Sequence, residues 1–174
     1  MNYQFHWVSL FILISGMCWI IITRQSSGPT IVVAPGFPLP ELTYTTTTGS
    51  LVNPSSHGRA RILTLWASWC PPCRAEIPVL AAIAPSLALH GVDVVLVNQG
   101  ESPSDTQQFL IDQHINMPVW YDRQGLLATA VASRDLPTTV FVDESGIVRL
   151  VYRGPVAPDV LLSIAVTLKN RGHP

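Results

Sequence analysis

One short stretch limits most strongly what this chain can fold into. Residues 62–67 form an apolar run rich in β-forming side chains, and Cys70-Pro71-Pro72-Cys73 follows almost at once. From Ile77 onward, apolar residues recur at spacings of three and four, which is typical of a helix. The stretch therefore predicts a strand, a turn and a dithiol at the start of a helix.

The position of the two cysteines predicts their chemistry. Cys70 would lie beside the unpaired backbone N–H groups and the positive dipole end of the helix, which favour the nucleophilic thiolate. Cys73 lies one turn further on and can close a disulfide with Cys70, expelling whatever Cys70 has captured. We therefore predict that Cys70 is the attacking thiol and Cys73 the resolving thiol.

The two prolines between the cysteines bear on the direction of the chemistry. Neither Pro71 nor Pro72 has an N–H that could stabilise a Cys70 thiolate. A strongly stabilised thiolate makes a dithiol oxidising, so this motif favours a moderate Cys70 pKa and a reducing dithiol. The positive charge of Arg74 acts in the opposite direction.

A cysteine pair of this spacing can also be half of a metal site or a structural bridge. A structural zinc site needs four ligands, but the chain has no second CxxC motif, and His57, His90, His114 and His173 are scattered. We predict no bound metal and no cofactor. Copper binding or delivery stays open as the alternative from a different functional class.

Composition and charge bound the remaining possibilities. The chain has 174 residues, of which 48% are hydrophobic, enough for one domain and a short extra segment. Its net charge of -1 without a basic block makes nucleic acid an unexpected partner. Only three cysteines are present, too few for a disulfide-stapled scaffold.

The N-terminal segment predicts a membrane anchor. Sixteen consecutive residues, Trp7 to Ile22, lack a formal charge and are nearly all apolar, close to the ~17–25 residues that span a bilayer as a helix. We expect an uncleaved anchor in residues 1–24, with a cleaved signal peptide as the alternative. Residues 25–33 are then a tether, and residues 34–174 the folded domain.

Periodicity and turn signals predict an α/β fold with a mixed central sheet. A small hairpin is expected at residues 42–52, a helix capped by Ser102 and a second hairpin around residues 143–146. The further expected strands are 92–97, 118–121, 138–142 and 147–152, and the further helices start near residues 125 and 158.

Three motifs in order resemble one family. Residues 66–78, WASWCPPCRAEIP, resemble its active-site signature; residues 97–102, VNQGES, resemble a segment after the next strand; and residues 136–143, LPTTVFVD, resemble its cis-proline loop. The chain is similar, over about residues 34–168, to thioredoxin-fold proteins of the membrane-tethered TlpA/ResA/CcmG (DsbE) group of bacterial thiol-disulfide oxidoreductases.

The resemblance implies roles for several residues besides the cysteines. Glu76 would exchange a proton with Cys73, the alternative being a solvated first-turn acid that gains from the helix dipole. Pro137 would be cis and face the dithiol, with Leu136 and Thr138 beside it as substrate-binding residues. Trp69, next to the attacking thiol, is a further candidate for substrate contact.

The resemblance also implies a function and a location. The expected enzyme is a bacterial thiol-disulfide oxidoreductase, held in the inner membrane by one span with its soluble domain in the periplasm. It would reduce disulfides in exported proteins, including apocytochrome c before haem attachment, and be re-reduced by a membrane electron donor of the DsbD/CcdA type. Net disulfide oxidation or isomerisation is the redox alternative.

Overall fold

The computed structural model describes residues 30–32, 36–53 and 58–170. The predicted anchor in residues 1–24 lies outside these ranges. The strands are β1 (Thr30–Val32), β2 (Phe37–Pro38), β3 (Tyr44–Thr46), β4 (Leu51–Val52), β5 (Ala60–Trp66), β6 (Val92–Gln99), β7 (Val119–Asp122), β8 (Thr138–Val142) and β9 (Ile147–Arg153). The helices are α2 (Pro71–Leu89), α3 (Pro103–Asp112), α4 (Leu126–Ala130) and α5 (Pro158–Asn170).

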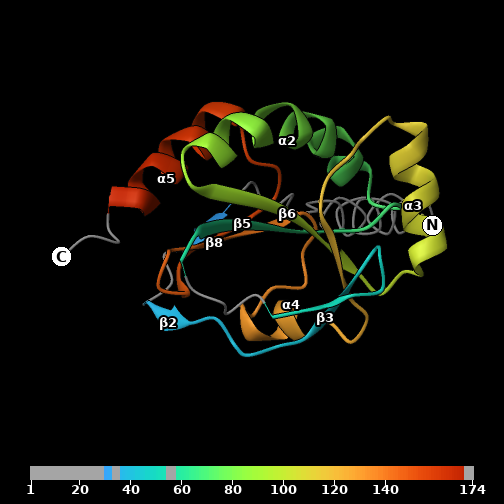
Figure 1. Ribbon diagram of the computed structural model, residues 1–174, viewed down its shortest axis with the longest axis horizontal. Helices are drawn as coiled ribbons and strands as arrows, with labels where there is room; N and C mark the ends of the chain where they lie inside the picture. The colour runs from blue at the N-terminus through green and yellow to red at the C-terminus, as the bar shows by residue number, and fades with distance from the viewer. Residues whose placement is uncertain (1–29, 33–35, 54–57, 171–174) are drawn as a thin grey trace, which may run out of the picture.

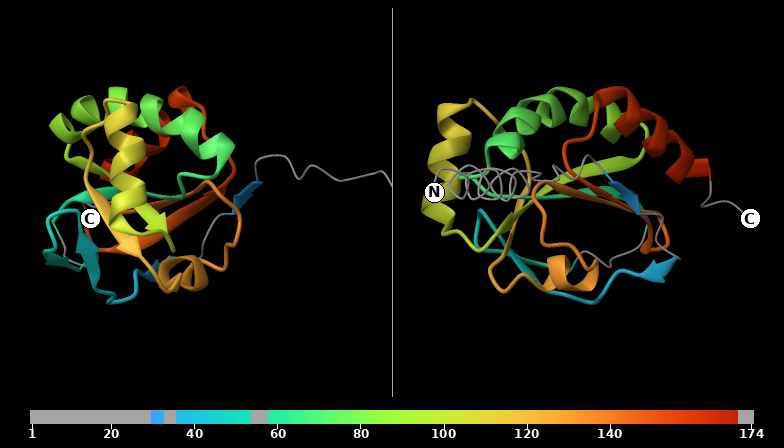
Figure 2. Two further views of the ribbon diagram at one scale, coloured as in Figure 1. Left: turned by 90° about the vertical axis from the view of Figure 1, so that its right-hand side faces the viewer. Right: turned by 180° about the vertical axis from the view of Figure 1, so that it is seen from behind.

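The described strands form one mixed sheet, as the sequence predicts. Its order is β1-β9-β8-β5-β6-β7-β3-β4, with β2 also paired to β9. β5, β6 and β7 are parallel, whereas β8 and β9 run antiparallel on the other side of β5. Figures 1 and 2 show α2 and α5 on one face of this sheet and the short α4 on the other. β5, which leads into the dithiol, therefore lies in the middle of the sheet.

Each face of the sheet has its own apolar core because side chains alternate along the strands. On one face, Ile62 of β5 and Leu96 of β6 pack with Ile77 of α2 and with the inner side of α5. On the other face, Leu63, Leu65, Val95 and Val97 pack with Leu127 of α4, and the rings of Tyr44 and Trp120 stack at 5.9 Å. This burial explains why β5 and β6 are apolar almost without interruption.

The helix α2 covers the sheet and carries the cysteines at its N-terminus. It is continuous although Pro78 and Pro85 lie inside it. By length and composition it is, among the described helices, the one that is apolar enough to cross a membrane. Its buried residues Ile77, Leu80 and Leu87 pack on the sheet, which makes it the core helix of the domain.

The start of the ordered sheet differs from the sequence prediction. Residues 30–32, which were expected to belong to the tether, form β1 and pair antiparallel with β9, Thr30 opposite Arg153 and Val32 opposite Val151. β-branched residues such as Ile31 and Val32 favour extended backbone, and the edge of β9 offers them free hydrogen-bonding groups. The ordered sheet thus begins before the expected boundary at residue 34.

Candidate active site

The turn between β5 and α2 sets the position of Cys70. β5 ends at Trp66, and the Cys70 N–H donates to the Ala67 carbonyl oxygen at 3.2 Å. Cys70 is the N-cap of α2, with extended backbone angles, and its carbonyl oxygen accepts from the Arg74 N–H at 3.1 Å. Pro71 fits the first helical position because the N–H it lacks would have no partner there. The predicted strand, turn and helix are all present.

Cys70 and Cys73 are joined by a disulfide, with their Cα atoms 5.3 Å apart. The two residues are 3% and 0% exposed. The backbone N–H of Cys73 reaches the Cys70 sulfur at 3.3 Å, whereas Pro71 and Pro72 have no N–H to offer it. The structure therefore has the pair in its oxidised form, at the helix start where the sequence places it.

Glu76 lies on the buried face of α2, one turn after Cys73. It is 5% exposed, and its Oε1 accepts from the Val156 N–H at 2.7 Å, in the loop before α5. Its Oε2 is buried and finds no hydrogen-bond partner in the described part of the chain. Burial raises the pKa of Glu76 to about 7, and the Val156 hydrogen bond acts against this rise. Glu76 is thus a buried acid, so the solvated alternative is wrong.

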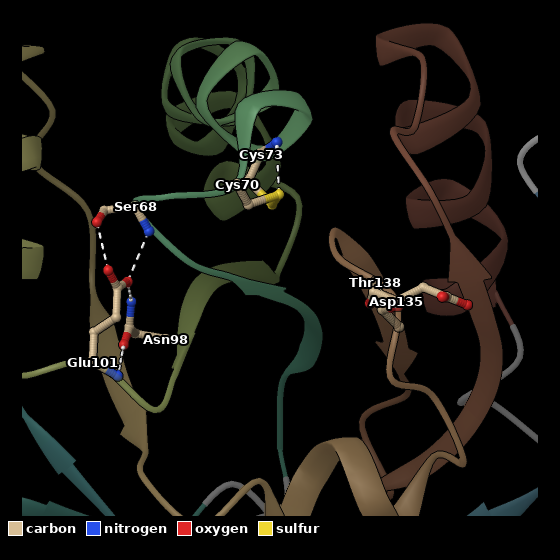
Figure 3. Close-up of a disulfide and its surroundings, with 7 residues drawn as sticks. All are labelled: Ser68, Cys70, Cys73, Asn98, Glu101, Asp135 and Thr138. Carbon is tan, nitrogen blue, oxygen red and sulfur yellow. Dashed lines mark hydrogen bonds between the residues drawn. A yellow bond between two sulfur atoms is a disulfide. The ribbon is translucent and has the colours of Figure 1, made fainter. Parts of the chain in front are cut away.

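The loop before β8 reaches the same end of the sheet. The Leu136–Pro137 peptide bond is cis, the geometry that the resemblance implies. Thr138, the first residue of β8, pairs with Leu65 near the end of β5, so Pro137 lies beside the exit of β5 toward Cys70. The Thr138 Oγ1 donates to the Asp135 carbonyl oxygen at 2.7 Å. Figure 3 shows Thr138 and Asp135 across from the disulfide.

The two tryptophans of the motif have opposite surroundings. Trp66 is fully buried and its ring lies 5.5 Å from that of Phe109 on α3. Trp69 is 67% exposed, directly before Cys70 in the chain. The Arg74 guanidinium lies over the Phe109 ring, 5.2 Å from its centre. Trp69 is therefore available to a docking protein, while Trp66 belongs to the core.

Sequence reasoning missed a polar cluster beside the dithiol, made of Ser68, Asn98 and Glu101. The Glu101 carboxylate accepts from the Ser68 N–H, the Ser68 hydroxyl and the Asn98 side-chain amide. One signal was present: the carboxyl ends of adjacent parallel strands meet at one edge, so polar residues after β6 must lie near the turn after β5. Val156, the partner of Glu76, had no such signal.

A cavity of about 620 Å³ lies at the other end of the sheet. Its lining includes Arg61 and Asp93, near the starts of β5 and β6, together with Ala84 and Ala88 in the C-terminal half of α2. None of its lining residues is among those described above around the dithiol.

Comparison with known proteins agrees with this geometry. The model of the Redoxin family matches residues 34–167. A thiol-disulfide oxidoreductase ResA from Geobacillus kaustophilus is 28% identical over 151 residues, which are 86% of each chain. The Bacillus subtilis protein of the same name is 28% identical over 87% of this chain and 85% of its own.

Solved structures show the same fold. A thiol:disulfide interchange protein of the thioredoxin family from Chlorobium tepidum superposes with a TM-score of 0.67 and 27% identity, over 79% of this chain and 99% of its own. A DsbF homologue from Corynebacterium diphtheriae, at 24% identity, has a TM-score of 0.71 over 83% of this chain and 97% of its own. The chain belongs to the Redoxin family, has the thioredoxin fold, and is a thiol-disulfide oxidoreductase.

Proposed function

We propose that this protein reduces disulfides in exported proteins, with Cys70 as the attacking thiol, Cys73 as the resolving thiol and Glu76 as the proton carrier between steps. The observation that carries the proposal is the Cys70–Cys73 disulfide at the start of α2 with the buried Glu76 one turn later. Of the two Glu76 oxygens, Oε1 accepts a hydrogen bond and Oε2 has no partner in the described part of the chain. A reversible dithiol beside an acid that can change its charge is suited to thiol-disulfide exchange.

The reaction starts from the reduced protein. The Cys70 thiolate attacks one sulfur of a substrate disulfide, so that a mixed disulfide forms and the other substrate sulfur leaves and is protonated. The Glu76 carboxylate takes the proton of the Cys73 thiol, and the Cys73 thiolate then attacks the Cys70 sulfur. This step closes the Cys70–Cys73 disulfide and expels the second substrate sulfur as a thiolate, which takes up a proton as Glu76 gives up its own. The substrate has gained two electrons and the protein has lost them.

Substrate docking would use the surface around the dithiol. Exposed Trp69 offers an aromatic face next to Cys70. On the β8 side of the dithiol, Leu136 lies in the loop just before β8, which pairs with the end of β5, and its backbone would pair with an extended segment of substrate. Thr138, held by Asp135, fixes the end of that loop. Binding by backbone pairing suits an enzyme that accepts many unfolded sequences.

The surroundings of Cys70 favour reduction over oxidation. The Cys73 N–H reaches the Cys70 sulfur, but Pro71 and Pro72 cannot donate to it. A thiolate with few donors is only moderately stabilised, so the reduced form keeps its tendency to give electrons away. We expect a reduction potential of about -270 to -200 mV, far from the roughly -120 mV of a strong oxidant.

A protein that reduces exported proteins must be located outside the cytoplasm and needs a source of electrons. We place the domain in the bacterial periplasm, held by residues 1–24 in the inner membrane and re-reduced by a membrane donor of the DsbD/CcdA type. The apolar run from Trp7 to Ile22 supports the anchor, and the relatives named thiol-disulfide oxidoreductase ResA, which are similar over most of the chain, support the redox role. Apocytochrome c before haem attachment is the substrate that we expect within this group.

The test is to trap substrates in bacterial cells on the Cys73→Ala variant of the full chain. Without the resolving thiol, Cys70 should accumulate mixed disulfides with exported proteins, identifiable by non-reducing electrophoresis and mass spectrometry. Cys70→Ala is the matched control and should trap none. Equal trapping by both variants would contradict the assigned roles, and a measured potential near that of a strong oxidant would contradict the reducing direction.

A further inference from the structure

Glu101 lies in the loop between β6 and α3 and is bonded more completely than an ordinary surface acid. Its Oε2 accepts from the Ser68 N–H at 2.7 Å and from the Asn98 Nδ2 at 2.6 Å, while its Oε1 accepts from the Ser68 hydroxyl. Its own N–H donates back to the Asn98 Oδ1 at 3.2 Å. Figure 3 shows the carboxylate facing Ser68, with Asn98 beside it. Both carboxylate oxygens are therefore in use.

These bonds join two segments that are distant in sequence. Trp66, the last residue of β5, pairs with Asn98 near the end of β6, so the two strands leave the sheet at the same edge. Ser68 belongs to the turn after β5, and Glu101 to the loop after β6, 33 residues later. The side chain of Glu101 thus fixes one exit loop against the other.

The fixed loop is the one that presents the reacting sulfur. Ser68 is held at both its N–H and its hydroxyl, and the Cys70 N–H closes the turn onto the Ala67 carbonyl oxygen. Trp69 stands between these two fixed points with 67% of its surface exposed. We propose that Glu101 is a positioning residue for disulfide exchange, which holds Ser68 so that Trp69 and Cys70 meet the substrate in one orientation.

An ionised carboxylate suits this task. It only accepts hydrogen bonds, so three donors can share its two oxygens without conflict. Bonds to a charged acceptor are shorter and stronger than neutral ones, and all three hydrogen bonds to the Glu101 carboxylate are 2.7 Å or less in length. Orientation matters for the rate, because a misplacement of about 1 Å at a reacting centre can cost on the order of a hundredfold.

The test compares Glu101→Ala with Glu101→Gln in the full chain. A glutamine amide oxygen can replace Oε2 as the acceptor for Ser68 N–H and Asn98, and its NH₂ can donate to the Ser68 hydroxyl, which also accepts. Alanine removes all of these bonds. Glu144→Ala and Glu144→Gln are matched controls, since Glu144 lies on the turn between β8 and β9. The readouts are kcat and KM for insulin reduction driven by dithiothreitol, well below the melting temperature of each variant.

We expect Glu101→Ala to lower kcat/KM about tenfold, as a modest misplacement would. Glu101→Gln should stay within about threefold of the parent, because its hydrogen bonds survive, and the controls should match the parent. If Glu101→Gln fails as badly as alanine, the residue acts through its charge and the positioning role is wrong. If Glu101→Ala keeps its activity, or loses it only in proportion to its folded fraction, the role is also wrong.

Amide hydrogen exchange keeps the proposal testable if the alanine variant folds poorly. In the parent and in Glu101→Gln the Ser68 amide should be protected, because its N–H is bonded to residue 101. A Ser68 amide that exchanges as fast in the parent protein as in an unfolded peptide would overturn the proposal without any variant.

Discussion

Glu76 and Glu101 are the two carboxylates associated with the dithiol, one after Cys73 on α2 and one bonded to the turn before Cys70. Glu76 is buried, accepts one hydrogen bond from Val156, and keeps an oxygen without a partner in the described residues. Glu101 is partly exposed and accepts three hydrogen bonds on its two oxygens. The first is poorly solvated as an anion, whereas the second is well satisfied as one.

Two further buried acids show that burial alone does not explain this difference. Asp122 accepts from the Leu126 and Leu127 N–H groups at the start of α4. Asp143 accepts from the N–H groups of Ser145, in the turn before β9, and of Ile147, the first residue of β9, and forms an ion pair with Arg149. Both are fully bonded and shape a turn. Glu76 differs in having an unused oxygen, which is the property that a proton carrier needs.

The largest effect should come from Glu76→Gln, which removes the acid and keeps its shape. With a Glu76 pKa of about 7, the parent should exchange disulfides faster as the pH rises through 7, because the carboxylate then accepts the Cys73 proton. The variant should lack this rise and be about a hundredfold slower near pH 7.5, the usual size of general-base catalysis. Stopped-flow measurement of mixed-disulfide resolution checks it, and an unchanged pH profile would remove Glu76 from the mechanism.

The same residue should make the stability of the oxidised protein depend on pH. Burial raises the pKa of Glu76 from 4.5 in the unfolded chain to about 7 in the folded protein, so the folded state binds the proton more tightly. Its contribution is present below pH 4.5 and is lost as the pH rises to 7 and beyond.

Relative to Glu76→Gln, the parent should therefore lose about 2 kcal/mol of unfolding free energy between pH 5 and pH 8. Urea denaturation of both proteins at the two pH values measures it, and other titrating groups cancel in the difference. If the unfolding free energies of parent and variant changed equally between the two pH values, Glu76 would be charged in the folded state at pH 5. It would then be as well stabilised as an anion as Glu101 is.

The two thiols, Cys70 and Cys73, should also differ in their rate of alkylation. In the oxidised protein Cys70 is 3% exposed, directly after exposed Trp69, whereas Cys73 is fully buried on the α2 face shared with Glu76. After reduction, iodoacetamide should label Cys70 first, by roughly tenfold or more in rate, because the start of the helix favours its thiolate. Peptide mapping after short exposure gives the order, and prior labelling of Cys73 would reverse the assigned roles.

Elements encoded by neighbouring residues could be predicted from the sequence, whereas the hydrogen-bond partners of the two carboxylates could not. β5, α2 and their cysteines were predictable because an apolar run, two prolines and a helical period agree locally. The Ser102 cap of α3 and the turn between β8 and β9 were predictable in the same way. The partner of Glu76 was not, because Val156 lies 80 residues away and offers only its backbone N–H.

The bond from Glu101 to Ser68 was missed for a related reason. It depends on the register that sets Trp66 opposite Asn98, and register between parallel strands is a long-range property that the local pattern of β5 and β6 does not contain. Two of the three donors to Glu101 belong to Ser68, and one of these is a backbone group, which no residue type announces.

The smallest expected effect concerns Glu101 and comes from removing one of its hydrogen bonds at a time. Ser68→Ala deletes the hydroxyl that donates to Glu101 Oε1 and leaves the backbone bond, from residue 68 N–H to Oε2, in place. One hydrogen bond contributes about 1 kcal/mol, so kcat/KM for insulin should fall about two- to fivefold, less than in Glu101→Ala. Combining the two changes should add nothing, because alanine at 101 has already removed the acceptor. A double variant clearly slower than Glu101→Ala would show that Ser68 acts through some other partner. Glu101 would then have no positioning role in disulfide exchange.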